Sequence, residues 1–357
     1  MADRKGRPPE AALSPVPPES ALQKVQTELA WLRFLVPREA VQFLGRHLPL
    51  AQLRDHLPRF LGERLRLGLY PARVTDALQL TCARAHPPWG QPAELDPELP
   101  VQFTAAVPAV SILMVTYGNL DLTRLCLSSL QRAAGLLPFE LIVVDNHSQD
   151  GTAEYLLATQ AQGLLPLQVV CNQDNVGFAA ANNQAAKLAR GRYLVLLNND
   201  TVVLPGWLEG LINVLAADSH AGMVGPVTNS CGNEAQLGTP YRDLTQMATF
   251  AQDYTQSHAG QKDAPAMLTL FCAALPTELW QTIGGLDEAY GRGLFEDDDL
   301  AMAVRAHGRK LVLCRDVFVH HYGGAAFNRL PPREYLRLFW ENRRYFENKW
   351  HTTWVKR

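Results

Sequence analysis

Four acidic side chains stand in a row in the segment FEDDDL, residues 295–300, although the chain as a whole is nearly neutral. Crowded carboxylates repel one another, which can raise the pKa of one of them. A carboxylate with a raised pKa is a good general base, and a positioned base typically contributes about 10²–10⁴-fold to a rate. The segment therefore predicts proton-transfer chemistry, with a solvated acidic turn at the start of a helix as the alternative.

Further polar clusters end apolar runs that are typical of buried parallel strands. The clusters TYGN, DNHSQDGT and LNND end the runs at 110–117, 139–148 and 192–200, and another strand is predicted at 167–172. Helical spacing between these runs indicates an α/β fold with a parallel sheet. Because ligands of such sheets bind beyond the carboxyl ends of the strands, the clusters predict one shared site.

The cluster LNND ends in Asp200, a carboxylate with neighbouring amide oxygens. Mg²⁺ and Mn²⁺ prefer oxygen ligands and keep positions for water and substrate phosphates, so this cluster suits either ion. The alternative is an ordinary turn rich in Asn and Asp.

Composition narrows the classes of function. The chain has 33 basic and 35 acidic residues, which argues against a nucleic-acid partner. Its six cysteines are scattered without a C-x-x-C pair, so we expect buried free thiols in a reducing compartment. No apolar run reaches the length of a membrane span and the N-terminus has no secretory signal, so we expect a cytoplasmic protein.

Changes in composition divide the chain into five parts. Residues 1–20 predict a disordered Pro-rich tail, and apolar residues at helical spacing predict an all-helical module at 21–86. Residues 87–108 predict a linker, 109–330 an α/β domain, and 331–357 an amphipathic helix rich in aromatic and basic residues. The sequence leaves open whether that helix packs on the domain or lies on a membrane.

Together these motifs resemble a family of known enzymes. VSILMVTYGN, ELIVVDNHSQDGT, NVGFAAANNQAAKLARGRYLVLLNND, IGGLDEAY and FEDDDLAMAVRAHG have the order and spacing of family 2 (GT-A fold) inverting glycosyltransferases, rhamnosyltransferase-like branch. The joint pattern is specific, although each piece alone is weak. The resemblance implies a GT-A fold, which is a Rossmann-like, mostly parallel sheet flanked by helices, and transfer of a sugar from a nucleotide-sugar donor.

The resemblance also implies which residues hold the donor. Where the family often has Asp-Asp after the second strand, this chain has Asp145-Asn146, and the family's D-x-D is Asn198-Asn199-Asp200. An amide presents both a donor and an acceptor, so the preferred base stays open. The implied donor-binding residues are Thr116, Tyr117, Asp145, Asn146, Asn175, Gly177, Phe178, Asn198 and Asn199.

Catalytic and metal-binding residues follow from the same resemblance. Asp297 aligns with the family's base, which takes the proton of the acceptor hydroxyl in a single inverting displacement, and Glu296 is expected to orient the acceptor. Asp200 is expected to bind Mg²⁺ or Mn²⁺ together with His320 or His321, and the alignment favours His320. The implied acceptor contacts, for which ordinary loop and core positions are the alternative, are Asn229, Asn233, Glu234 and Trp280.

Two other functions remain as alternatives. A nucleotidyltransferase of the same fold would need a Gly-rich loop with a basic residue after the first strand, and VTYGNLDLTR lacks that pattern. A non-catalytic sugar-binding or scaffolding protein is favoured by Asn at two usually acidic positions but disfavoured by Asp200 and Asp297. For the transferase, the sequence leaves open a dTDP-, UDP- or GDP-sugar donor and a glycan, lipid-linked or protein acceptor. It also leaves open peripheral contact with the inner face of the membrane and a homo-oligomer.

Overall fold

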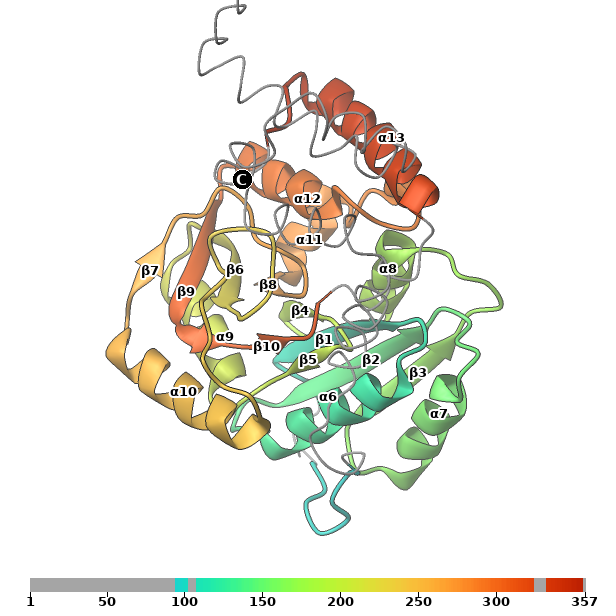
Figure 1. The fold of residues 1–357 in the computed structure, drawn as a ribbon, viewed down its shortest axis with the longest axis vertical. Helices are drawn as coiled ribbons and strands as arrows, with labels where there is room; N and C mark the ends of the chain where they lie inside the picture. Colours follow the sequence, from blue (N-terminus) through green and yellow to red (C-terminus); the bar gives the residue numbers. More distant parts are fainter. Residues whose placement is uncertain (1–93, 102–106, 324–331, 356–357) are drawn as a thin grey trace, which may run out of the picture. The chain divides into compact units, whose positions relative to one another are not determined.

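The computed structural model describes residues 94–101, 107–323 and 332–355 (Figure 1). The predicted disordered tail, the helical module at 21–86 and the first part of the predicted linker lie outside the described residues. Everything described belongs to one compact unit, Leu80–Arg357.

A mixed sheet of eight strands forms the centre of this unit, in the order β3-β2-β1-β4-β8-β6-β9-β7. The pairs β1–β2, β2–β3, β1–β4 and β6–β9 are parallel, whereas β8 is antiparallel to β4 and β6, and β7 is antiparallel to β9. Helices flank this mostly parallel sheet (Figure 1), which confirms the predicted α/β class. The strands are β1 (Val110–Thr116), β2 (Phe139–Asp145), β3 (Leu167–Cys171), β4 (Tyr193–Leu197), β6 (Ala221–Val227), β7 (Lys262–Asp263), β8 (Cys272–Pro276) and β9 (Lys310–Phe318).

Helices cover both faces because alternate side chains of a strand point to opposite faces of the sheet. On β1, Ile112 packs into a core shared with α6, α7 and α9, and the next residue, Leu113, packs into a second core shared with α8, α11 and α12. A strand buried on both faces must be apolar throughout, as the sequence of β1 is. The helices are α6 (Leu120–Arg132), α7 (Thr152–Gln162), α8 (Phe178–Leu188), α9 (Trp207–Ala217), α10 (Leu244–Ser257), α11 (Thr277–Ile283), the short 3₁₀ helix η1 (Glu288–Tyr290), α12 (Glu296–Ala306) and α13 (Pro332–Trp350).

A second, two-stranded sheet lies beyond the carboxyl end of β4. Its strands β5 (Thr201–Val202) and β10 (His320–His321) are antiparallel, with His321 paired to Thr201. Because β5 begins directly after Asp200, this pairing brings the chain that follows β9 to the end of β4.

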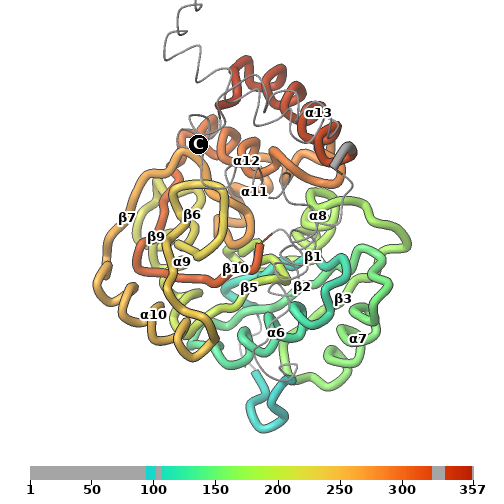
Figure 2. The backbone as a smooth tube through the Cα atoms, viewed as in Figure 1, coloured from blue at the N-terminus to red at the C-terminus, as the bar shows by residue number. Residues whose placement is uncertain are grey.

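The C-terminal helix α13 lies beside α12, as the ribbon and the backbone tube both show (Figures 1 and 2). The rings of Phe339 and Phe346 on α13 lie 5.2 and 5.8 Å from the ring of Phe295, and both side chains are buried. The apolar face of α13 therefore packs on the domain, over the acidic segment. Across the described part of the chain, no helix combines the length and the apolarity that crossing a membrane requires.

A close backbone contact joins the turn before α8 to the turn after η1. Gly177 has a φ of 91°, and a Cβ added to it would lie 2.0 Å from the carbonyl oxygen of Gly291. With ψ at 169°, Gly177 lies in a backbone region that essentially only glycine occupies, and the contact leaves no room for a side chain.

We predict that Gly177→Ala lowers the free energy of unfolding by at least about 2 kcal/mol, because this backbone region costs roughly 1–3 kcal/mol once a Cβ is present and the contact with Gly291 adds to that cost. Urea denaturation of the wild type and the variant measures the difference. Gly232→Ala is the matched control, since a Cβ there meets nothing within 4 Å. Equal losses in the two variants would contradict the prediction.

Candidate active site

The polar clusters that end the first, second and fourth strands lie side by side. At the end of β1, Thr116 Oγ1 donates to Asp145 Oδ1 at the end of β2, at 2.8 Å. After β4, the side-chain amide of Asn199 donates to Thr123 Oγ1 at 2.9 Å and to the Gly118 carbonyl at 3.4 Å. The sheet therefore gathers these clusters at one edge, as the rule for parallel sheets predicts.

The side chain of Asn146 holds the loop that precedes α8. Its Nδ2 donates to the Gly177 carbonyl at 3.2 Å, and its Oδ1 accepts from Asn172 Nδ2 at 2.8 Å. Asn146 is buried, whereas Tyr117, at the end of β1, is 45% exposed. Of these two predicted donor-binding residues, Tyr117 is the one that presents its side chain to solvent.

The loop from Asn175 to Phe178 is fixed by its own hydrogen bond. Asn175 Oδ1 accepts from the backbone N–H of Gly177 at 2.9 Å, and Phe178 is the first residue of α8. Together with the bond from Asn146, this bond ties the loop to the carboxyl end of β2. The predicted donor-binding loop and the end of β2 thus form one unit.

Of the three residues in Asn198-Asn199-Asp200, Asp200 is the one whose side chain lies beside a histidine in the described structure. Asn199 turns toward α6, and the backbone of Asn198 accepts from Thr201 Oγ1 at 2.7 Å. Asp200 is 5% exposed, and its Oδ1 lies 3.3 Å from Nε2 of His321.

His321 is held in a defined orientation. Its Nδ1 donates to the Ser230 carbonyl at 2.7 Å. Asn229 binds the backbone of His321 at both ends of its amide, since Oδ1 accepts from the His321 N–H at 2.8 Å and Nδ2 donates to the His321 carbonyl at 3.0 Å. Burial opposes protonation of the ring, but the charge and the hydrogen bond of Asp200 outweigh it, so the pKa of His321 is raised.

His320 points into an aromatic cluster instead. The Tyr241 hydroxyl hydrogen-bonds to its Nδ1 at 2.7 Å, and the ring of Tyr322 lies 4.7 Å away. Burial, with a smaller effect of the neighbouring His321, lowers the pKa of His320 to about 3. The sequence alignment favoured His320 as the partner of Asp200. The structure instead places His321 there, because adjacent residues of a strand point in opposite directions.

Glu296 and Asp297 occupy the first turn of α12, where the helix dipole favours negative charge. Glu296 is 7% exposed, and in the described structure its Oε2 has no hydrogen-bond partner. Burial and then the charge of Asp298 raise the pKa of Glu296 to about 7.

Asp297 lies near enough to His321 for their charges to interact. Burial raises its pKa well above the usual range, and the charges of Glu296 and Asp298 raise it further. A backbone hydrogen bond from Leu270 and the charge of His321 act in the opposite direction. Glu296 is buried and Asp297 is half-buried, so the acidic segment differs from a fully solvated turn.

Asp299 has a different task from its neighbours. It accepts from Tyr290 Oη at 3.0 Å, from Lys349 Nζ at 2.9 Å and from Trp350 Nε1 at 2.7 Å. It thus anchors α13.

The residues predicted to contact the acceptor form hydrogen bonds within the protein or lie in its core. Asn229 holds His321, Asn233 Nδ2 donates to the Met267 carbonyl at 3.2 Å, and Glu234 Oε1 accepts from the Ala266 N–H at 2.9 Å. Trp280 is 5% exposed and packs in the core beneath α11. The position of Trp280 follows from its place on the buried face of that helix.

Sequence reasoning missed Asn342 of α13, whose Nδ2 donates to three carbonyl groups just before the acidic segment. The signal was its spacing, three residues after Phe339 and four before Phe346, which puts a polar side chain in an apolar helical stripe. A buried amide must find partners.

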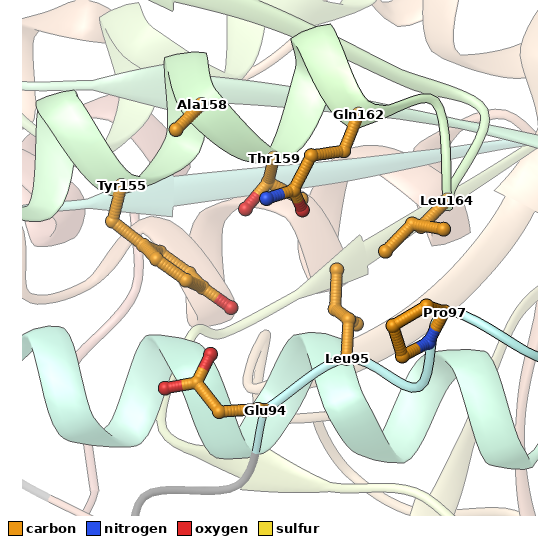
Figure 3. A pocket seen from close by; sticks show the side chains of 8 residues that line it. All are labelled: Glu94, Leu95, Pro97, Tyr155, Ala158, Thr159, Gln162 and Leu164. Carbon is orange, nitrogen blue, oxygen red and sulfur yellow. The ribbon is translucent and has the colours of Figure 1, made fainter.

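A cavity of about 470 Å³ lies elsewhere, between the segment 94–97 and α7 (Figure 3). None of the predicted site residues lines it. The lining residues are Glu94, Leu95, Pro97, Tyr155, Ala158, Thr159, Gln162 and Leu164.

Asp200 and His321 offer two ligands to a cation. Within the described ranges, no group of three or more His, Cys, Asp or Glu side chains is placed to hold a metal ion. Any ion at this position would therefore need ligands from its substrate or from water.

Comparison with known proteins identifies the domain. Residues 111–272 match the family model described as Glycosyl transferase family 2, and this part of the chain is a domain of that family. The uncharacterized protein y4gI of Sinorhizobium fredii is 27% identical over 254 residues, which are 69% of this chain and 28% of that protein. The O-antigen biosynthesis protein RfbC of Myxococcus xanthus is 26% identical over 266 residues, which are 66% of this chain and 19% of that protein.

The chain therefore spans less than a third of the length of either relative. Among solved structures, it is similar to the mannosyltransferase PcManGT from Pyrobaculum calidifontis in complex with GDP-Man and Mn²⁺. The sequence identity is 20%, the TM-score is 0.47, and the match covers 71% of this chain and 65% of that one. The matched family region contains Asp145 and Asp200, whereas Glu296, Asp297 and His321 lie beyond it.

The raised pKa of Glu296 predicts a pH-dependent stability. Between about pH 4.5 and 7 the folded protein holds a proton that the unfolded chain has lost, so the stabilisation is complete below this window and is lost as the pH rises through it. Glu296→Gln cannot ionise. Its free energy of unfolding should therefore rise relative to the wild type by a few kcal/mol across the window, at about 1.4 kcal/mol per pKa unit.

Urea denaturation of both proteins at several pH values measures this difference. Glu278→Gln is the matched control, because Glu278 is an exposed glutamate in the first turn of α11. Its difference from the wild type should stay flat. A flat difference for Glu296→Gln would show that Glu296 is ionised in the folded protein throughout.

Proposed function

We propose that this chain is an inverting glycosyltransferase that moves a sugar from a nucleotide-sugar donor to a hydroxyl group of an acceptor. The observation that carries the proposal is that His321 lies 3.3 Å from Asp200 and also close enough to Asp297, in the acidic segment, for their charges to interact. The family 2 domain at 111–272 supports the class of reaction.

Asp297 acts as the general base. It takes the proton of the acceptor hydroxyl while that oxygen forms a bond to the anomeric carbon of the sugar. The bond from this carbon to the diphosphate oxygen breaks at the same time, and the electron pair leaves with the nucleoside diphosphate. Because attack and departure occur on opposite faces, the configuration inverts. The raised pKa of Asp297 favours this role, since a stronger base accepts the proton more readily.

Glu296 is the residue that orients the acceptor. It lies beside Asp297, is buried, and has a carboxylate oxygen without a hydrogen-bond partner in the described structure. A pKa of about 7 keeps part of the population protonated near neutral pH, so that Glu296 can donate a hydrogen bond to a sugar oxygen.

Asp200 and His321 fit a divalent cation, Mg²⁺ or Mn²⁺. Their Oδ1 and Nε2 atoms are 3.3 Å apart, close to the roughly 3 Å that separates adjacent ligands of an octahedral ion of this size. The hydrogen bond from His321 Nδ1 to Ser230 leaves Nε2 to face the ion, as is usual for metal-bound histidine. Such an ion would neutralise charge on the diphosphate leaving group.

The donor side is formed by the ends of β1 and β2 and the loop before α8. Asp145 is buried there and accepts from Thr116, and Tyr117 presents an exposed ring to the same edge. A dTDP-, UDP- or GDP-sugar is the proposed donor.

The acceptor is a growing glycan or a lipid-linked saccharide, with a protein hydroxyl as the alternative. The name of the Myxococcus xanthus relative, an O-antigen biosynthesis protein, supports a glycan acceptor. A lipid-linked acceptor would bring the chain to a membrane surface.

Asp297→Asn should lower the rate of sugar transfer by about 10²–10⁴-fold, the usual contribution of a general base. The affinity for the nucleoside diphosphate should stay nearly unchanged, because the substitution preserves the shape of the side chain. Turnover of UDP-, GDP- and dTDP-sugars and calorimetric binding of the matching diphosphates measure the two effects. Asp253→Asn is the control and should keep the wild-type rate, because Asp253 is an exposed aspartate of α10 outside the site. Full activity of Asp297→Asn would exclude Asp297 as the base.

His321→Ala and Asp200→Asn should each weaken binding of Mn²⁺ in the presence of a nucleoside diphosphate by at least about 10-fold, because the first removes a ligand and the second removes the negative charge of one. Electron paramagnetic resonance of free Mn²⁺ measures the affinity directly. His220→Ala is the control, because His220 is an exposed histidine outside the site. Unchanged Mn²⁺ affinity in both site variants would show that the ion binds elsewhere or is not required.

A further inference from the structure

The turn that leads into the acidic segment has an uncommon backbone conformation. Leu294 and Phe295 have φ angles of 75° and 76°, in a region that only a few per cent of residues other than glycine occupy. Such conformations persist where the surrounding structure enforces them, and they cluster at functional sites. Phe295 is also the N-cap of α12, so its conformation sets where Glu296 and Asp297 begin the helix.

Asn342 of α13 holds this turn. It is 5% exposed, and its Nδ2 donates to the carbonyl oxygens of Tyr290 at 2.9 Å, Gly293 at 2.8 Å and Leu294 at 3.1 Å. The two N–H groups of this one amide are thus shared among three carbonyl groups of the turn. Only a donor can satisfy them, which also fixes the orientation of the amide.

Other contacts of α13 flank the same turn. Before Asp297 in the chain, the ring of Phe295 lies 5.2 Å from that of Phe339. After it, Asp299 accepts hydrogen bonds from Lys349 and Trp350. Helix α13 therefore grips the chain on both sides of Asp297. This helix lies outside residues 111–272, which match the family.

The turn also touches the loop that precedes α8. The carbonyl oxygen of Gly291 occupies the place that a Cβ of Gly177 would take. A displacement of the turn would therefore change the position of Asp297 relative to that loop.

We infer that Asn342 is a positioning residue of the active site, which acts through the turn at 290–295 to fix Asp297 against the donor-binding loop. The inferred effect of Asn342 on catalysis rests on the proposed function. Helix α13 is in this view a working part of the site rather than an appended surface helix.

The test compares Asn342→Leu with the wild type. Leucine has nearly the shape of asparagine but donates no hydrogen bond, so the three carbonyl groups lose their partner. We expect hydrogen–deuterium exchange to speed up in peptides covering 290–299. We also expect kcat with UDP-, GDP- or dTDP-sugars and Mn²⁺ to fall by about 10²-fold, as a displacement of about 1 Å can cause, with a much smaller change in donor KM.

Asn348→Leu is the matched control, because Asn348 is an exposed asparagine on the same helix. It should match the wild type in exchange and in kcat. If Asn342→Leu does not fold, Asn342→Ser keeps one donor in a smaller side chain and should show the same changes to a lesser degree.

Exchange and kcat of Asn342→Leu equal to those of Asn348→Leu would overturn the inference. Equal reductions in kcat and in donor affinity would assign Asn342 a general structural role and would overturn it as well. A wild type that turns over none of the donors would refute the proposed function itself, and the exchange comparison would then still decide whether Asn342 holds the turn.

Discussion

The approach of Asp200 to His321 is the interaction on which the rest of the site depends. A buried carboxylate is costly unless a proton donor or a cation meets it, and Asp200 is 5% exposed. The imidazole nitrogen lies 3.3 Å away because β10 pairs with β5 and because Asn229 and Ser230 hold the ring. The two-stranded sheet thus places His321, which is far from Asp200 in the sequence, at the carboxyl end of β4.

The acidic segment adds negative charge to the same place, and the fold must hold it there. Leu294 and Phe295 each adopt a left-handed conformation, at a cost of roughly 1–2 kcal/mol per residue. Contacts with α13 offset this cost, and burial raises the pKa values of Glu296 and Asp297. The structure therefore holds Glu296 and Asp297 where their pKa values are raised, and a raised pKa makes the deprotonated carboxylate a stronger base.

Features with a local signal could be predicted from the sequence, and features set by long-range pairing could not. Buried parallel strands are continuous apolar runs, so the sheet and the polar residues that end its strands could be predicted from the sequence. The choice between His320 and His321 depends on the register of β10 against β5, which no local pattern encodes. Trp280 lies in the core because α11 buries the face that carries it. The position of Asn342 in an apolar stripe predicts that its amide needs hydrogen-bond partners, but the sequence does not show which groups those partners are.

Thermal unfolding with UDP, GDP, dTDP, CDP or ADP, each in Mn²⁺ or in EDTA, tests the central claim most directly. A ligand at a hundred times its dissociation constant stabilises a protein by about 2.7 kcal/mol, which a melting curve resolves easily. We predict that one nucleoside diphosphate raises the melting temperature in Mn²⁺ and fails to do so in EDTA. If none of them shifts the melting temperature, or if the shift is the same in EDTA, the assignment of a metal-dependent nucleotide-sugar site to Asp200 and His321 is contradicted.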